Sequence, residues 1–319
     1  MAAHRGQLEV AGAGVGVQVA SYVAQVESEE DHATVGDWLL LDRATMRPGR
    51  VLRRTSLFKR RAPGAGRALQ LLAANVDTLL IVSSCNQDFN VARLERYLVL
   101  ARDAGVTPVV VLTKADLASA PDDYARIARK IQPQLMVEVV NALDPDSVAR
   151  IGPWCGTGQT MALMGSSGVG KSTLVNTLTE STAVATQGVR EDDDKGRHTT
   201  TSRSLHRLPQ GGWLLDTPGM RELQLADAAS GLQDVFDDIV GLARGCRFSD
   251  CAHESEPGCA VRSAIANGAL DEERFRRWRK LADEEAHNTS TLAERRTRAR
   301  AFGKRVRAAT KAREGRRWQ

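Results

Sequence analysis

The sequence has few aromatic residues, no long hydrophobic run and an odd number of cysteines. Aromatic side chains make up 4% of the 319 residues, so a core must be built from Ala, Val, Leu and Ile. No run approaches the roughly 18 apolar residues that a membrane-spanning helix needs, and the first residues have no apolar signal core. Five cysteines without an export signal argue against a disulfide framework. We therefore expect a cytoplasmic protein that does not contact a membrane.

Positive charge is unevenly placed along the chain. Hydrophobic residues make up 42% and charged residues 26%, which is a globular balance, and the net charge is +5. Residues 291–319 hold 11 Lys/Arg and two Glu, a net charge of +9, so the remainder carries −4. Residues 43–67 add nine Lys/Arg and no acidic residue. Basic clusters on an otherwise acidic chain indicate a polyanionic partner, and RNA is the first candidate.

The pattern of apolar residues divides the chain into three parts, which predicts a multidomain protein. Short apolar runs separated by Gly, Asp and Pro predict strands in residues 1–65, and a small β-barrel would leave them no exposed edge. In residues 66–225, strand-length apolar runs alternate with helical stretches, which is typical of an α/β domain with a parallel sheet. Residues 226–319 predict a mostly helical domain with a basic tail. The strand-length runs of the central part are 78–82, 108–112, 136–140, 160–164 and 213–215.

A phosphate-binding loop follows the fourth of these runs and opens a predicted helix, which is the context that the pattern G-x-x-x-x-G-K-[ST] requires. Backbone N–H groups of such a loop converge on phosphate oxygens. We expect Lys171 to neutralise charge on the β- and γ-phosphates during catalysis, and Ser172 to bind Mg²⁺. The motif consists of Gly165, Ser166, Ser167, Gly168, Val169, Gly170, Lys171 and Ser172, and Thr173 follows it.

Two further motifs predict contacts with a guanine nucleotide. Asp216 ends a predicted strand and is expected to hold Mg²⁺ through water, while the N–H of Gly219 meets the γ-phosphate. The tetrapeptide Thr113, Lys114, Ala115 and Asp116 also follows a predicted strand. Asp116 would accept hydrogen bonds from the guanine N1–H and exocyclic amine, which adenine lacks, and the Lys114 stem would pack along the base.

Departures from the usual guanine motifs occur at two positions. Thr113 stands where Asn is usual and cannot repeat all the bonds of an amide. Asn141 and Ala142 follow a later strand and would close over the base with backbone N–H groups, with Asn141 in place of the commoner Ser.

The order of the motifs is inverted relative to ordinary GTPases, because the base motif at Thr113 precedes the phosphate loop at Gly165. The site survives such a permutation when chain termini of the domain lie close together. The segment after Gly219 then leads directly into the C-terminal domain. Loss of the γ-phosphate would therefore be transmitted mechanically to that domain.

The polar, glycine-punctuated segment 188–201 is expected to contain the remaining catalytic groups. We expect Thr200 to bind Mg²⁺ when the γ-phosphate is present. Many GTPases orient the attacking water with a Gln after the Asp-x-x-Gly motif, but this chain has Met220 there. The nearest polar substitute is His198, which would orient the water as a neutral imidazole.

Four candidate metal ligands lie close together in the C-terminal part. Cys246, Cys251, His253 and Cys259 supply three thiolates and one imidazole. This donor set predicts a closed tetrahedral Zn²⁺ site, structural because no coordination position stays open. Such a site would stabilise a domain with little core of its own.

These residues together resemble the small-ribosomal-subunit-dependent GTPase A family, also called RsgA or YjeQ, a group of circularly permuted bacterial GTPases. The resemblance implies an N-terminal OB-fold barrel that binds RNA, a central permuted GTPase domain and a C-terminal zinc domain. It also implies late maturation of the 30S ribosomal subunit, contact with 16S rRNA, and hydrolysis of GTP to GDP that the subunit stimulates. The family's switch-loop His is thought to be catalytic, and His198 matches that position. We expect a monomer.

Two alternatives stay open at the level of sequence. A GTP-gated scaffold that binds rRNA, with incidental hydrolysis, would carry the same motifs. An ATP-using phosphate-loop enzyme is the other, and Asp116 argues against it because adenine offers that carboxylate no pair of donors.

Overall fold

The computed structural model describes residues 2–4, 7–12, 15–20, 27–61, 69–181, 203–216, 220, 223 and 225–289. Within these ranges, no helix is long and apolar enough to span a bilayer.

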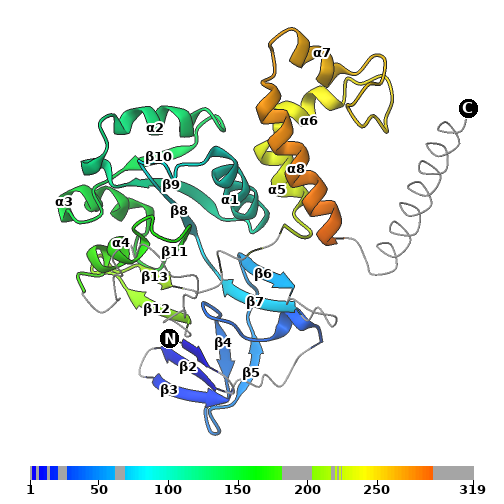
Figure 1. Cartoon of the computed structure of the whole chain (residues 1–319). Coiled ribbons are helices and arrows are strands. Elements are labelled where there is room, and N and C mark those ends of the chain that lie inside the picture. The colour runs from blue at the N-terminus through cyan, green and yellow to red at the C-terminus, as the bar shows by residue number, and fades with distance from the viewer. Residues whose placement is uncertain are drawn as a thin grey trace, which may run out of the picture.

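A mixed sheet lies at the centre of the molecule (Figure 1). Among the residues described, nine strands join it in the order β10-β9-β8-β11-β13-β12-β1-β2-β3. Five of them, β8, β9, β10, β11 and β13, run parallel to one another, and the predicted α/β arrangement is confirmed there. Their bounds are β8 (Thr78–Ser84), β9 (Thr107–Thr113), β10 (Met136–Val139), β11 (Thr160–Gly165) and β13 (Trp213–Asp216).

Antiparallel strands extend this sheet on one side. Strand β12 (Arg203–Arg207) pairs with β13, and β1 (Ala2–His4) pairs with β12. Strands β2 (Gln7–Gly12) and β3 (Val15–Ala20) follow. The first predicted strands therefore join the central sheet. The pairs β4 (Leu39–Leu41) with β5 (Pro48–Val51) and β6 (Leu57–Arg61) with β7 (Leu69–Ala74) form separate two-stranded sheets. The described sheets thus contain no closed barrel, and the barrel stays a prediction.

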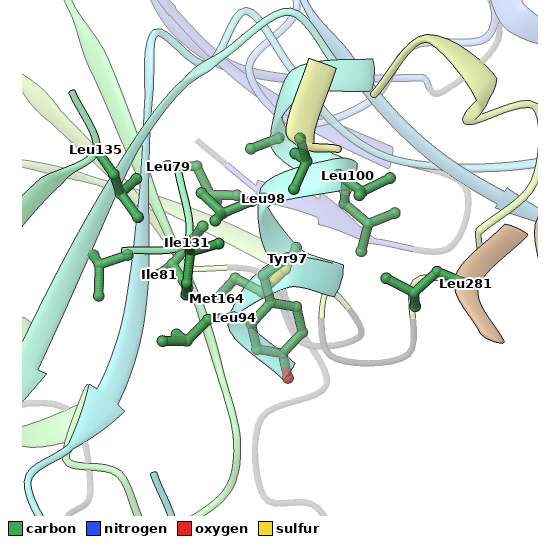
Figure 2. Packing of buried hydrophobic residues seen from close by; sticks show 14 of the residues in the cluster. Leu79, Ile81, Leu94, Tyr97, Leu98, Leu100, Ile131, Leu135, Met164 and Leu281 are labelled. Carbon is green, nitrogen blue, oxygen red and sulfur yellow. The ribbon is translucent and has the colours of Figure 1, made fainter. Parts of the chain in front are cut away.

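Helices cover both faces of the parallel strands, as the alternation of buried residues requires. Leu79 and Ile81 of β8 face α1 (Val91–Asp103) and α2 (Pro121–Arg129). The intervening Leu80 and Val82 face α3 (Pro145–Val148), η3 (Ala149–Trp154) and α4 (Lys171–Leu178). Figure 2 shows the first of these clusters, with Leu281 on the side of α1 away from β8.

Helix α1 is a boundary between the sheet and the C-terminal helices. The Asn90 side chain accepts a hydrogen bond from the Arg93 N–H and caps the helix, and Leu94, Tyr97, Leu98 and Ala101 repeat at helical spacing and are buried. At Gly231 of the C-terminal part, a Cβ would come within 2.2 Å of the Val99 carbonyl oxygen. Only glycine therefore lets the helix that contains residue 231 approach α1 this closely. The C-terminal helices are α5 (Ala229–Val235), α6 (Asp237–Ala243), α7 (Ala260–Ala266) and α8 (Glu272–Thr289) (Figure 1).

Candidate nucleotide site and metal centre

The predicted nucleotide-binding motifs lie at one edge of the sheet. The phosphate loop follows β11, Thr113 ends β9, Asn141 follows β10 and Asp216 ends β13. Because these strands are parallel, their carboxyl ends meet at the same edge, which is where open α/β sheets bind ligands.

The phosphate loop leads directly from the sheet into α4. A Cβ at Gly165 would lie 2.3 Å from the Val82 carbonyl oxygen, so the close packing of β11 on β8 requires glycine there. Gly170 has φ +89°, in the left-handed region, and precedes the first turn of α4. Ser172 and Thr173 are half-buried in that turn. The loop therefore leads directly into the N-terminus of α4, and the N–H groups at a helix N-terminus suit an anion.

Lys171 folds back over the loop that precedes it. Its Nζ donates a hydrogen bond to the Gly165 carbonyl oxygen at 2.9 Å and another to the Ser166 carbonyl oxygen. The ammonium group is thus held against the mouth of the loop, where phosphate oxygens would exchange for these carbonyls.

Thr113 connects the base motif to the phosphate loop. Its side chain is buried, and its hydroxyl lies 2.6 Å from the Val169 carbonyl oxygen and 3.1 Å from that of Ser83. The two motifs, far apart in the sequence and inverted in order, therefore touch. The hydroxyl that replaces the usual amide joins β8, β9 and the phosphate loop in the interior.

The predicted base-binding loops lie beside α4. Lys114 has φ +57° and turns the chain into η2 (Ala115–Leu117), which leaves Asp116 exposed. The Ala142 carbonyl accepts a hydrogen bond from the Thr177 hydroxyl of α4 at 2.7 Å. The Asn141 N–H donates to the Ser147 hydroxyl at 3.0 Å, and the Asn141 side-chain oxygen accepts from the Leu143 N–H. The side-chain amide of Asn141 thus stabilises the turn that contains it.

Arg93 is a contact of the phosphate loop that no sequence motif indicates. Its Nη1 lies 2.6 Å from the Ser166 hydroxyl. The partner of an arginine in the first turn of a helix depends on tertiary packing, which a sequence motif does not show. The predicted residues His198, Thr200 and Gly219 lie outside the described residues. Asp216 is half-buried at the end of β13.

The four predicted metal ligands converge in the C-terminal part. Their donor atoms all lie within 4.8 Å of one another. The Sγ atoms of Cys246 and Cys259 are 3.9 Å apart, and the Nδ1 of His253 lies 3.6 Å from the first and 3.4 Å from the second. Tetrahedral ligands with bonds of about 2.3 Å are separated by roughly 3.8 Å. The cluster therefore fits a single tetrahedral metal ion.

Surrounding residues hold this cluster in place. The Cys259 Sγ accepts a hydrogen bond from the Arg262 N–H at the start of α7. The His253 ring packs against Phe275 and Trp278 of α8. Burial lowers the pKa of His253, which favours the neutral imidazole that metal binding requires.

The remaining two cysteines are buried in apolar surroundings, and we expect them to resist alkylation. Burial raises the pKa of the Cys85 thiol to about 11 and also raises the pKa of Cys155. Only the thiolate reacts, so at pH 8 about one thousandth of Cys85 is reactive, and its labelling rises only as the pH approaches 11. Mass spectrometry after iodoacetamide treatment at pH 8 should find both unlabelled. Labelling of either at the rate seen in guanidinium chloride would contradict this burial.

Some basic residues of the stretch 43–67 form ion pairs within the fold, and others are exposed. Arg54 is held in the fold, since it forms an ion pair with Asp37 at 2.7 Å and donates to the His32 carbonyl. Lys59 pairs with Glu30 at 2.6 Å. Both had been expected to face a polyanion, but each has an acidic partner here. The exposed basic residues of the stretch that the structure describes are Arg43, Arg47, Arg50 and Arg53, on and beside the β4–β5 pair.

The fold and the joined motifs define a class of protein, a P-loop GTPase whose sequence motifs are circularly permuted. A family model described as RsgA GTPase matches residues 51–226. A model of ABC transporters matches residues 154–299, a range that includes the phosphate loop.

Curated relatives and solved structures agree with this class. The chain is 51% identical over 293 residues to the small ribosomal subunit biogenesis GTPase RsgA 2 of Vibrio parahaemolyticus, covering 91% of this chain and 82% of that protein. It is 54% identical over 258 residues to the small ribosomal subunit biogenesis GTPase RsgA of Mesorhizobium japonicum, covering 80% and 74%. The chain belongs to the RsgA family of circularly permuted GTPases.

The likeness to solved structures concerns the fold. YjeQ from Thermotoga maritima superposes with a TM-score of 0.60 at 23% identity, covering 86% of this chain and 92% of that chain. YloQ, described as a circularly permuted GTPase, superposes with a TM-score of 0.58 at 22% identity, covering 90% and 96%.

Proposed function

We propose that this protein binds the small (30S) ribosomal subunit during its late maturation and hydrolyses GTP to GDP and phosphate when the subunit stimulates it. The observation that carries the proposal is the identity of 51% over 91% of the chain to a small ribosomal subunit biogenesis GTPase. The contact of Thr113 with the phosphate loop supports a site that holds a base and a triphosphate together.

Catalysis in this proposal consists of positioning and charge neutralisation. Backbone N–H groups of residues 165–173 bind the phosphates, and Lys171 exchanges its carbonyl partners for the β- and γ-phosphate oxygens. His198 orients the attacking water as a neutral imidazole, and the Gly219 N–H meets the γ-phosphate. Ser172 and Thr200 would hold Mg²⁺ directly and Asp216 through water, and the ion would neutralise charge that develops on the transferred phosphoryl group.

The base pocket is the part that selects GTP. Asp116 accepts from guanine, the Lys114 stem packs along the base, and Ala115, Asn141 and Ala142 border it. We expect Asp116→Asn to weaken GTP binding about 100-fold and to erode the preference over ATP, because one acceptor becomes a donor facing guanine donors. Competition of GTP and ATP against a fluorescent nucleotide measures this, with Asp123→Asn, an exposed carboxylate on α2, as the control. An unchanged preference would overturn the assignment of Asp116.

We propose three domains. Residues 1–65 form an OB-fold barrel that binds RNA, residues 66–225 the permuted GTPase domain, and residues 226–319 a zinc domain with a basic tail. The ion at Cys246, Cys251, His253 and Cys259 is Zn²⁺, since three thiolates and one imidazole favour this metal. Its role is structural, because the protein fills all four positions. The protein acts as a monomer in the cytoplasm.

Contact with 16S rRNA is assigned to exposed basic residues. Arg43, Arg47, Arg50 and Arg53 are exposed on and beside the β4–β5 pair, and Trp38, which precedes β4, is 65% exposed. Guanidinium groups bind phosphates and an exposed indole stacks on an unpaired base, so this surface suits RNA better than duplex DNA. The basic tail would add salt-dependent affinity without reading sequence.

The test is hydrolysis of GTP with and without purified 30S subunits. The proposal expects slow release of phosphate by the protein alone and at least tenfold faster release with the subunit. Binding of the subunit with no change in rate would favour a GTP-gated scaffold instead. Failure to bind either GTP or the subunit would overturn the proposal.

A further inference from the structure

Helix α1 contacts the phosphate loop at one end of its first turn and the long C-terminal helix α8 one turn later. Arg93 reaches the Ser166 hydroxyl at 2.6 Å. Arg96, on the same side of the helix, makes a bidentate ion pair with Glu284 of α8, with N–O distances of 2.5 and 2.7 Å. Arg96 also donates to the Leu223 carbonyl at 3.2 Å, in the segment that follows Asp216.

A buried carboxylate fixes the same two helices a second time. Glu95 of α1 is fully buried, and its two oxygens accept from Arg274 at 3.2 Å and from Arg277 at 2.7 Å, both on α8. Arg274 also binds both oxygens of Asp238 on α6, at 2.7 and 2.9 Å. A buried charge with directional partners tolerates little displacement. Helices α6 and α8 therefore help to fix the rotation of α1 about its axis, together with the packing of Leu94 and Leu98 on the sheet.

The rotation of α1 decides where the Arg93 side chain points. Arg93 and Arg96 are three residues apart and so lie next to each other on the helix surface. If α8 releases Arg96 and Glu95, α1 keeps its packing on the sheet but loses these anchors, and the Arg93 guanidinium is held less firmly on Ser166. Ser166 lies between Gly165 and Ser167 in the loop, and its carbonyl also accepts from Lys171.

We infer that Arg93 is a positioning residue of the phosphate loop and that α8 sets its position through the Arg96–Glu284 pair. The C-terminal part thereby adjusts nucleotide affinity through α1. This inference rests on the proposed function, since it takes residues 165–172 as the site for phosphate.

The experiment compares Arg93→Ala, Glu284→Ala and the double variant in the full-length protein, with GTP as the probe. Loss of one charge-assisted hydrogen bond should raise the KM about fivefold in Arg93→Ala with kcat changed less than twofold. Glu284→Ala should raise the KM two- to threefold, and Arg93→Lys should recover most of the affinity. The double variant should match Arg93→Ala, because Glu284 acts only through Arg93. Multiplied effects in the double variant would overturn the inference.

Hydrogen exchange of residues 165–172 supplies a readout that needs no nucleotide. Exchange should be faster in Arg93→Ala and Glu284→Ala than in the wild type. The control is Arg276→Ala, an exposed arginine of α8 that pairs only with Glu272 and Glu273 in the described contacts, and it should change nothing. Unchanged exchange in Glu284→Ala would overturn the inference even where GTP is hydrolysed normally. A wild type that binds no GTP would overturn the proposed function, while the exchange still tests the link from α8 to the loop.

Discussion

Replacement of Lys171 by alanine is expected to raise the dissociation constant for GTP at least 100-fold and to reduce hydrolysis below detection. The ammonium group lies over the phosphate loop, held by the carbonyl oxygens of Gly165 and Ser166. Losing a preorganised positive group where phosphate charge develops typically costs a factor of about 10² to 10³ in rate. Fluorescent-nucleotide titration and phosphate release measure the two effects.

The matched control for this variant is Lys130→Ala, because Lys130 is exposed at the end of α2, away from the phosphate loop. It should bind and hydrolyse GTP as the wild type does. The thermal midpoint of Lys171→Ala should stay within a few degrees of the wild type, since Lys171 is half-buried and gives up only hydrogen bonds to loop carbonyls. Normal GTP binding by Lys171→Ala would show that residues 165–172 do not hold the phosphates.

Replacement of Cys259 by serine is expected to release the bound metal ion and unfold the loop between α6 and α7. Cys259 supplies one of the four donors, caps α7 and is buried. Binding of structural Zn²⁺ contributes roughly 10–16 kcal/mol to the folding of small zinc domains. The packing of His253 on Phe275 and Trp278 does not compensate for the loss of that contribution. Elemental analysis should find one Zn²⁺ per chain in the wild type and none in the variant. Removal by a chelator should have the same effect on the unfolding curve.

The control for the metal site is Cys85→Ala, which removes a buried thiol outside the cluster. It should keep one metal ion per chain and lose only the stability of a small buried group, about 1 kcal/mol. Retention of stoichiometric metal by Cys259→Ser would exclude Cys259 as a ligand. A metal-free wild type with an unchanged melting curve would exclude a structural metal.

The apolar runs and the phosphate loop were sufficient to predict the central fold. The run 78–82 lies in β8 and the run 160–164 in β11, because buried parallel strands need continuous apolar sequence. The grouping of Cys246, Cys251, His253 and Cys259 predicted the metal cluster, since the ligands are close in sequence as well as in space.

Other features depend on packing that no local pattern encodes. Strand β1 pairs with β12, at least 200 residues further along the chain, and composition alone did not reveal this partner. Arg54 and Lys59 belong to a basic run, yet their acidic partners Asp37 and Glu30 lie earlier in the chain. The role of Thr113 was equally hidden, because a residue that departs from a motif shows its substitute contact only when the loop beside it is folded.

At Gly231 the backbone of α5 rests on the carbonyl of Val99, with no side chain between the two helices. The two helix backbones are therefore in direct contact at this point, and no side chain can rearrange there to accommodate a shift. Lifting α5 off α1 would also hydrate Leu232 and Val235, which are buried, at about 25 cal/mol for each Å² of apolar surface exposed. The C-terminal helices are therefore held against the sheet domain as one packed unit through α1.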